Sequence, residues 1–237
     1  MEIKDKVMLI TGASGGIGSA ISKHLGDLGA KMVLTSRDQK ELKKLSSEIP
    51  NSAVISGDLT QAKDAKRIVE TTVEKFGRID VLINCAARAM FAQVEQVNLE
   101  EYRSLLELNV VAPLQLMQLV IPQMRIQGGG TILNISSLSS KKYIPKIAGY
   151  ASTKYALNAL SLTARQELAK DDIVVSIIRP NIVDTDFGRH TPSSEPDALR
   201  HASDGSVLPH VLTTETVAKK VAELIQSGEP EVDILEN

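Results

Sequence analysis

The sequence has one cysteine, no tryptophan, three phenylalanines and four tyrosines. A single thiol, Cys85, cannot form an internal disulfide or hold a zinc ion alone, which excludes disulfide-stapled scaffolds and zinc modules. So few aromatic rings do not supply a stacking platform for single-stranded nucleic acid. The histidines show no metal-ligand spacing, so no metal site is predicted; they are His24, His190, His201 and His210.

An excess of charge of either sign is also missing. Twenty-seven lysines and arginines stand against 29 aspartates and glutamates, a formal net charge of −2, so no basic field attracts nucleic acid or anionic lipid. Uninterrupted apolar runs end well short of the roughly 20 residues that a membrane span needs, and residues 1–6 lack the apolar core of a signal peptide. We therefore expect a cytoplasmic protein without nucleic-acid or membrane partners.

Short apolar segments alternate with helical patterns along nearly the whole chain. Strand candidates are residues 6–11, 31–36, 53–56, 80–84, 130–136, 173–179 and 231–235. Helix candidates lie near residues 17–28, 38–48, 61–76, 100–126, 150–169 and 213–227. Continuous apolar strands suit a sheet that is covered on both faces. The order predicts an α/β fold of one domain, residues 1–237, with a doubly wound (Rossmann) parallel sheet of about seven strands.

Residues 186–212 interrupt this alternation. They carry Pro192, Pro196 and Pro209 and show no sustained periodicity. A long irregular stretch within a compact domain is typical of a lid or binding loop. We predict a substrate lid here, with plain disorder as the open alternative.

A glycine-rich turn separates the first strand from the first helix. Gly12 permits a sharp turn, Gly16 lets the backbone approach a pyrophosphate, and Gly18 lets helix and strand pack closely. The N–H groups and positive dipole end of the helix then face the phosphates. The turn is therefore predicted to bind a dinucleotide through Gly12, Ser14, Gly16, Ile17 and Gly18.

The next strands supply the adenosine side of this expected site. The second strand ends in Ser36 and Arg37, where a cation would neutralise a 2′-phosphate, so NADP(H) is predicted over NAD(H). A solvated surface arginine is the alternative interpretation. Asp58 and Leu59 follow the third strand and could hold the adenine edge. Asn84 and Ala86 follow the fourth strand and could line the adenosine side and brace the central strands.

Tyr150 and Lys154 are four residues apart at the start of a helical pattern and therefore share one face. A phenol titrates near pH 10, so acid or base chemistry near neutrality needs a pKa shift of roughly 3 units, or about 4 kcal/mol. One ammonium about 4 Å away at an intermediate dielectric supplies an interaction of that order. We expect Lys154 to lower the pKa of Tyr150 and to make a proton-transfer unit.

The glycine pattern at residues 11–18, Asn84, Asn109, Ser137 and the YxxxK pattern at 150–154 together resemble the short-chain dehydrogenase/reductase family, in its short single-domain branch. The resemblance covers essentially the whole chain. It implies that Tyr150 donates or accepts the proton, that Lys154 lowers the pKa of Tyr150 and binds the nicotinamide ribose, and that Ser137 holds the reacting oxygen.

Further roles are implied by the same resemblance. Asn109 would support a water molecule that relays protons to Lys154, and Ile182 and Thr185 would contact the carboxamide of the nicotinamide. Cys85 and Ala87 replace an asparagine and a glycine of the family pattern. A packed thiol is the preferred interpretation of Cys85 over a reactive one.

These observations predict NADPH-dependent reduction of a carbonyl compound to an alcohol, or the reverse oxidation, by hydride transfer at a Ser–Tyr–Lys–Asn site. The alternative is an NADP(H)-binding regulator or sensor without turnover. The expected partner is a small carbonyl or alcohol molecule whose identity the sequence does not reveal. The resemblance also implies a homodimer or homotetramer, formed through the helices near 100–126 and 150–169.

Overall fold

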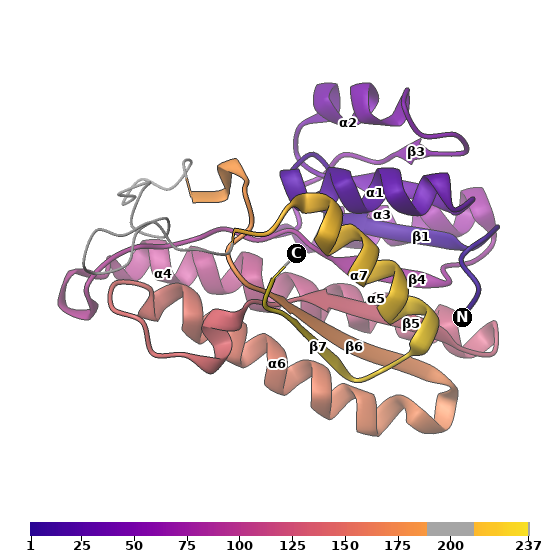
Figure 1. Cartoon of the computed structure of the whole chain (residues 1–237). Coiled ribbons are helices and arrows are strands. Elements are labelled where there is room, and N and C mark those ends of the chain that lie inside the picture. The colour runs from indigo at the N-terminus through magenta and orange to yellow at the C-terminus, as the bar shows by residue number, and fades with distance from the viewer. Residues whose placement is uncertain (189–210, 237) are drawn as a thin grey trace.

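The computed structural model describes residues 1–188 and 211–236 as a parallel sheet between two layers of helices (Figure 1). The sheet order is β3-β2-β1-β4-β5-β6-β7, and every neighbouring pair is parallel. The strands are β1 (Val7–Thr11), β2 (Lys31–Thr35), β3 (Ala53–Val54), β4 (Val81–Asn84), β5 (Gly130–Ile135), β6 (Ile173–Pro180) and β7 (Glu231–Ile234). The predicted doubly wound sheet of seven strands is confirmed.

The helices cover both faces of this sheet. They are α1 (Gly16–Asp27), α2 (Gln39–Ser46), α3 (Ala62–Phe76), α4 (Leu99–Leu106), α5 (Ala112–Ile126), α6 (Ala148–Leu168) and α7 (Thr214–Ser227). Helices α1, α2 and α7 share one apolar core with the sheet, and α3, α5 and α6 share the other. Figure 1 shows α1 and α7 lying side by side across the front of the sheet.

Residues of one strand alternate between these two cores. In β1, Met8 and Ile10 pack on the α1 side, whereas Val7 and Leu9 pack on the α3 side. All four side chains are at most 2% exposed. A strand buried on both faces needs the continuous apolar run that the sequence provides. The carboxyl ends of the strands are thereby held at one edge, where the loops are free to carry chemistry.

The helix expected over residues 100–126 differs in detail from the prediction. It is continuous from Leu99 to Ile126, but a π-helical turn, η2 (Glu107–Val111), lies between α4 and α5. Such turns widen a helix by one residue and are frequent at functional sites. The buried side chain in this turn is Asn109.

This same helix is long and apolar enough to cross a membrane by length and composition, which the sequence analysis did not anticipate. Its inward residues nevertheless belong to the protein core. Leu116, Val120 and Met124 are at most 1% exposed and pack with strands and with α3. We therefore interpret it as a helix of the protein core that packs against the sheet.

Most of the predicted lid, residues 186–212, lies outside the described residues. Its described ends are η5 (Asp186–Gly188) and residues 211–212. The N–H of Leu212 donates to the carbonyl of Ile182 at 2.7 Å, and the N–H of Asp184 donates to the carbonyl of Leu212 at 3.0 Å. The segments that enter and leave this region are thus joined directly after β6.

Candidate active site

The glycine turn has the geometry that the sequence predicted. Gly12 has φ +66°, and a Cβ placed on it would lie 2.8 Å from the Cα of Ala86. A Cβ on Gly18 would collide with the carbonyl oxygen of Gly12. Only glycine fits both positions, because one needs a left-handed backbone and the other needs a bare Cα.

Helix α1 begins directly after this turn, at Gly16. Its N-cap, Gly15, has no capping side chain, and no acidic residue lies in the first turn. The first N–H groups of a helix have no intrahelical acceptor, so here they stay open to an anion. A Cβ on Gly16 would lie 2.7 Å from Cγ2 of Thr185. Thr185, which follows β6, therefore lies against the turn that is predicted to hold the phosphates.

The end of β2 presents a cation and no free carboxylate. Arg37 is exposed and has no ion pair within the described residues. The nearest carboxylate, Asp38, caps α2 by accepting hydrogen bonds from the N–H groups of Lys40 at 2.9 Å and Glu41 at 3.1 Å. Because the Asp38 carboxylate is engaged in this cap, Arg37 is the charged side chain at the end of β2 that can bind an anion.

Asp58 and Leu59 lie beside the end of β2. The N–H of Gly57 donates to the carbonyl of Ser36 at 3.0 Å, which joins the loops after β3 and β2. Asp58 Oδ1 accepts from the N–H and hydroxyl of Thr60, at 3.0 and 2.8 Å, and Leu59 is buried. The structure thus places four of the six predicted adenosine-side residues, Ser36, Arg37, Asp58 and Leu59, in adjoining loops.

Thr11 and Asn84 fix the loops at the centre of the sheet. The Thr11 Oγ1 accepts from the N–H groups of Cys85 and Ala86, both at 3.0 Å. Asn84 Nδ2 donates to Asn134 Oδ1 at 2.7 Å, whereas the buried Asn84 Oδ1 has no hydrogen-bond partner in the described part of the chain. Asn134 Nδ2 in turn donates to Ser161 Oγ of α6 at 2.8 Å, so this pair of amides ties β4 and β5 to α6.

Ser137 follows β5, and its hydroxyl oxygen accepts a hydrogen bond. The N–H of Ser139 donates to Ser137 Oγ at 3.2 Å, so the hydroxyl proton is left to donate elsewhere. A hydrogen bond from Ser137 to Tyr150 favours the phenolate and lowers the pKa of Tyr150. The structure therefore brings Ser137 and Tyr150 together, from β5 and α6.

Tyr150 and Lys154 face the same side of α6. The Nζ of Lys154 lies 5.8 Å from the centroid of the Tyr150 ring and donates to the carbonyl of Ile135 at 2.9 Å. The lysine is 3% exposed, so its ammonium group is held inside the protein next to the phenol.

The expected direction of the Tyr150 pKa is wrong for this structure. Burial raises the pKa of Tyr150 to about 12, and this outweighs the hydrogen bond from Ser137. Burial also lowers the pKa of Lys154 to about 8. Attraction between an ammonium group and a phenolate favours a low phenol pKa, but desolvation penalises both charged forms and prevails here.

Cys85 lies within electrostatic reach of both groups. Burial raises the pKa of the thiol to about 12, despite the opposing influence of Lys154. A thiol with such a pKa is protonated near neutral pH, and nucleophilic chemistry needs the thiolate. The packed-thiol interpretation of Cys85 is therefore favoured.

Asn109 binds two separate segments from the π-helical turn. Its Oδ1 accepts from the N–H of Arg88 at 2.9 Å, and its Nδ2 donates to the carbonyl of Arg88 at 2.9 Å and to Thr153 Oγ1 at 3.1 Å. Asn109 thus joins the loop after β4 to α6, one residue before Lys154. Its role in a water relay stays a prediction.

Two residues near the site carried no predicted role. Thr11 stabilises the loop after β4 through the hydrogen bonds given above. A hydroxyl residue at the end of the first strand was the feature of the sequence that could have indicated this role. Phe187 makes an edge-to-face contact with Tyr150, with ring centroids 5.8 Å apart. The contact spans 37 residues of sequence, so no local pattern could have revealed it.

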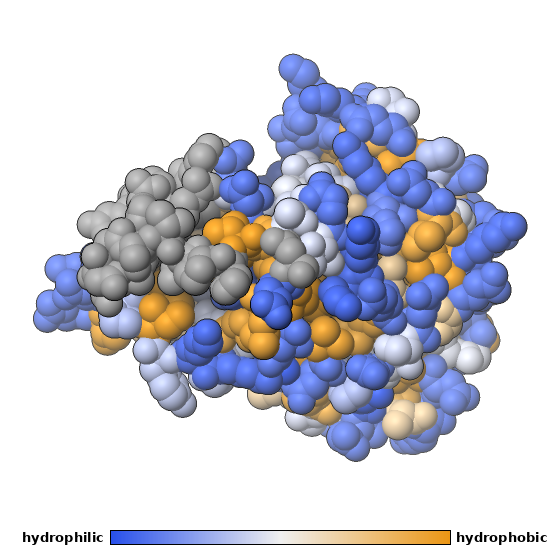
Figure 2. Space-filling view, viewed as in Figure 1, coloured by the Kyte–Doolittle hydropathy of each residue, from blue (hydrophilic) through white to orange (hydrophobic). Residues whose placement is uncertain are grey.

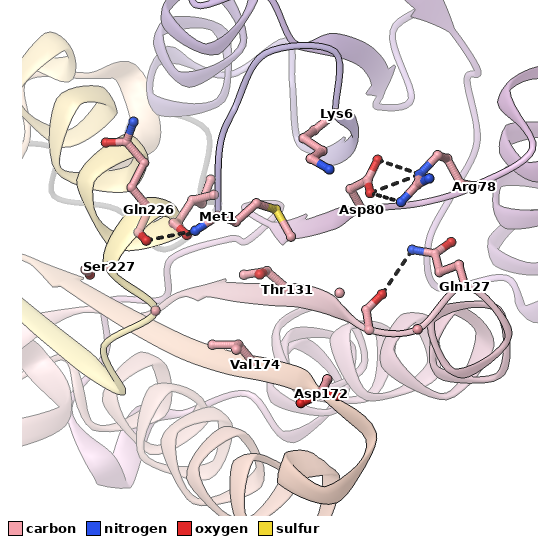
Figure 3. A pocket seen from close by; sticks show the side chains of 15 residues that line it. Met1, Lys6, Arg78, Asp80, Gln127, Thr131, Asp172, Val174, Gln226 and Ser227 are labelled. Carbon is pink, nitrogen blue, oxygen red and sulfur yellow. Dashed lines mark hydrogen bonds and ion pairs between the residues drawn. The ribbon is translucent and has the colours of Figure 1, made fainter.

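A cavity of about 360 Å³ lies at the opposite edge of the sheet (Figure 3). It is lined by the residues that begin β4, β5 and β6 and by the end of α7. The charged pair at its wall is already satisfied, since Asp80 accepts from Arg78 and, at 2.8 Å, from the N–H of Val7. The predicted site residues line the carboxyl edge, and this cavity is separate from them.

The buried lysine predicts a pH-dependent stability. The pKa of Lys154 is about 8 in the folded protein and 10.5 in the unfolded chain, so the unfolded chain binds the proton more tightly. The contribution of Lys154 to stability is therefore complete above pH 10.5 and is lost as the pH falls to 8. Relative to Lys154→Met, the wild-type free energy of unfolding should decline by about 3 kcal/mol over this window. Urea unfolding of both proteins across the window measures this; a constant difference contradicts the buried-ammonium geometry.

Comparisons with known proteins show which family this chain resembles. A family model described as short chain dehydrogenase matches residues 6–196. An uncharacterized oxidoreductase of Staphylococcus saprophyticus is 34% identical over 196 residues, covering 81% of this chain and 84% of the relative. An uncharacterized oxidoreductase of Staphylococcus epidermidis is 30% identical over 213 residues, covering 90% and 93%.

Solved structures are similar over nearly the full length. An alcohol dehydrogenase from the archaeon Thermococcus sibiricus, complexed with 5-hydroxy-NADP, has a TM-score of 0.84 at 27% identity and covers 98% of this chain and 96% of that chain. A metagenomic short-chain oxidoreductase in complex with NADP has a TM-score of 0.83 at 29% identity and covers both chains completely.

Proposed function

The chain belongs to the short-chain dehydrogenase family of NAD(P)-dependent oxidoreductases, and from this premise we propose that it reduces a small carbonyl compound with NADPH. The observation that carries the proposal is the half-buried Tyr150, which has both Ser137 and Lys154 beside it. Proteins of one fold differ in function, so the assignment rests on this site.

The residues present fit the dinucleotide. Gly12, Gly16 and Gly18 would hold the pyrophosphate, and the exposed Arg37 would hold the 2′-phosphate. When bound, NADPH would supply the hydride for the carbonyl carbon. Two structurally similar proteins carry NADP-type ligands, which supports the preference for the phosphorylated cofactor.

Tyr150 supplies the proton in this proposal. Because its pKa is raised, the phenol is protonated at neutral pH, which is the form needed to donate to a carbonyl oxygen. Ser137 donates its hydroxyl proton to the carbonyl oxygen of the substrate. This proton is available once Tyr150 hydrogen-bonds to the substrate instead of to Ser137. Lys154 places positive charge beside the phenolate that remains, and so stabilises the group that forms during proton transfer.

The test is a screen of purified protein with NADPH and a varied panel of aldehydes, ketones and keto esters, read by loss of the absorbance of reduced nicotinamide. Consumption of NADPH that depends on one carbonyl class supports the proposal. Tight cofactor binding without turnover across the panel would instead favour the regulator or sensor alternative.

Arg37→Ala should erase most of the preference for NADPH over NADH. Removal of charge-assisted bonds to a 2′-phosphate costs about 1.5–3 kcal/mol, so NADPH should bind roughly ten- to a hundredfold more weakly and NADH about equally well. Fluorescence titration of both cofactors measures this. Lys43→Ala removes an exposed charge from the adjoining α2 and is the matched control. Equal affinity of the wild-type protein for the two cofactors contradicts the assignment.

We further propose that the protein works as a homo-oligomer of one-domain subunits in the cytoplasm. Apolar side chains stay exposed along the helix of residues 99–126: Leu99 is 63%, Val111 42% and Ile126 83% exposed. A second copy of the chain could cover some of these exposed side chains. Figure 2 shows the face over α1 and α7, where hydrophilic residues surround smaller hydrophobic patches. Analytical ultracentrifugation tests the association state.

A further inference from the structure

Helix α6 contacts the end of β5 at successive turns. Tyr150, Lys154 and Asn158 are spaced by four residues and therefore follow one another along one side of the helix. The first interacts with Ser137, and the second donates to the carbonyl of Ile135. Asn158 has no part in the proposed proton transfer, yet it binds the same segment.

The Asn158 amide bridges the residues on either side of Ser137. Its Oδ1 accepts from the hydroxyl of Ser136 at 2.6 Å, and its Nδ2 donates to the hydroxyl oxygen of Ser140 at 2.8 Å. Ser140 in turn donates its hydroxyl proton to the carbonyl of Ser137 at 2.6 Å. The N–H of Ser140 donates to that same carbonyl at 3.0 Å.

The Ser140 hydroxyl decides which groups donate in this cluster, although it also lies 3.5 Å from the hydroxyl of Ser136. The Ser140 proton is given to the Ser137 carbonyl, so the Ser140 oxygen needs a donor, which an amide provides and a carboxylate does not. Ser136 and Ser140 are 4% and 3% exposed, so water does not readily replace a lost partner. A buried polar group left without its partner carries its full desolvation penalty.

We propose that Asn158 is a positioning residue that fixes the backbone of Ser137 and thereby aims its hydroxyl at the reacting oxygen. The inference rests on the reductase function proposed above. The N–H of Ser139 binds Ser137 Oγ at 3.2 Å, so the orientation of the hydroxyl follows the backbone of this turn, η3 (Leu138–Lys141). A small displacement there degrades the reactive geometry without touching the glycine turn or Arg37.

Asn158→Asp, which keeps the shape and removes the donor, and Asn158→Leu, which removes both partners, test the proposal. Each variant should lower kcat for the carbonyl substrate at least about tenfold, because positioning losses act on the reacting complex. The KM for NADPH should stay within about twofold of the wild type, since no cofactor contact is lost. A variant that folds and keeps wild-type kcat overturns the proposal.

Two further variants separate positioning from general destabilisation. Thr72→Val removes a buried hydroxyl that donates to the carbonyl of Ile68 at 2.7 Å within α3, and it should keep wild-type kcat. Ser140→Ala breaks the same chain from its other end. The double variant with Ser140→Ala and Asn158→Leu should lower kcat by much less than the product of the two single-variant factors, because both changes act through the Ser137 carbonyl. Independent effects overturn the proposed route.

Hydrogen exchange at the Ser140 amide gives a readout that needs no turnover. Asn158→Leu should speed this exchange, and Thr72→Val should leave it unchanged. A wild-type protein that binds NADPH but reduces no carbonyl refutes the proposed function. In that case, faster exchange in Asn158→Leu still supports the bridging role of Asn158, and unchanged exchange overturns it.

Discussion

Tyr150→Phe should bind NADPH normally and lose at least about a hundredfold in kcat, the usual range for removal of a general acid. The phenylalanine ring keeps the edge-to-face contact with Phe187 and the place of Tyr150 over Lys154. Only the hydroxyl is lost, so the defect should fall on proton donation and leave folding intact. Steady-state kinetics together with cofactor titration measure both quantities.

Tyr155→Phe is the matched control for this variant. Tyr155 lies on the same helix, is 36% exposed, and stacks against Tyr143 with ring centroids 6.2 Å apart. Removal of its hydroxyl should leave kcat unchanged. The role of Tyr150 is contradicted if Tyr150→Phe retains kcat within about tenfold of the wild type.

Gly12→Ala should weaken NADPH binding by about a hundredfold. The added Cβ would lie 2.8 Å from the Cα of Ala86, so the turn must shift away from the position that lets its N–H groups reach the phosphates. Loss of one or two hydrogen bonds to a charged phosphate costs about 3 kcal/mol. Isothermal titration with NADPH measures the change.

Gly77→Ala separates this effect from backbone strain. Gly77 has φ +75°, close to the φ of +66° at Gly12, but a Cβ there would meet no atom within 4 Å. Each alanine should lower the free energy of unfolding by roughly 1–2 kcal/mol, because each residue has a left-handed backbone. Only Gly12 lies in the turn that is expected to bind the cofactor. Equal NADPH affinity in the two variants would refute the cradle assignment.

The sequence predicted the sheet and the glycine turn because both follow from local patterns. Buried parallel strands need continuous apolar residues, and close backbone approach at Gly12 and Gly18 needs glycine. The i, i+4 spacing likewise places Tyr150 and Lys154 on one face wherever α6 forms.

Tertiary contacts explain what the sequence did not reveal. The pKa of Tyr150 depends on burial by distant segments, so its direction was mistaken when only Lys154 was considered. The π-helical turn around Asn109 breaks the expected single helix, and its amide meets Arg88 and Thr153 from other elements. The bridge from Asn158 to Ser140 spans 18 residues and joins a helix to a loop.

The most direct test of the account uses NADPH that carries deuterium at the transferable position, with a carbonyl that supports turnover. The account predicts that wild-type protein places one deuterium on the carbonyl carbon for each cofactor oxidised, and that Tyr150→Phe, with cofactor bound, does so at least about a hundredfold more slowly. Unlabelled product, or equal rates for the two proteins, would contradict the assignment of Ser137, Tyr150 and Lys154 as the reducing site.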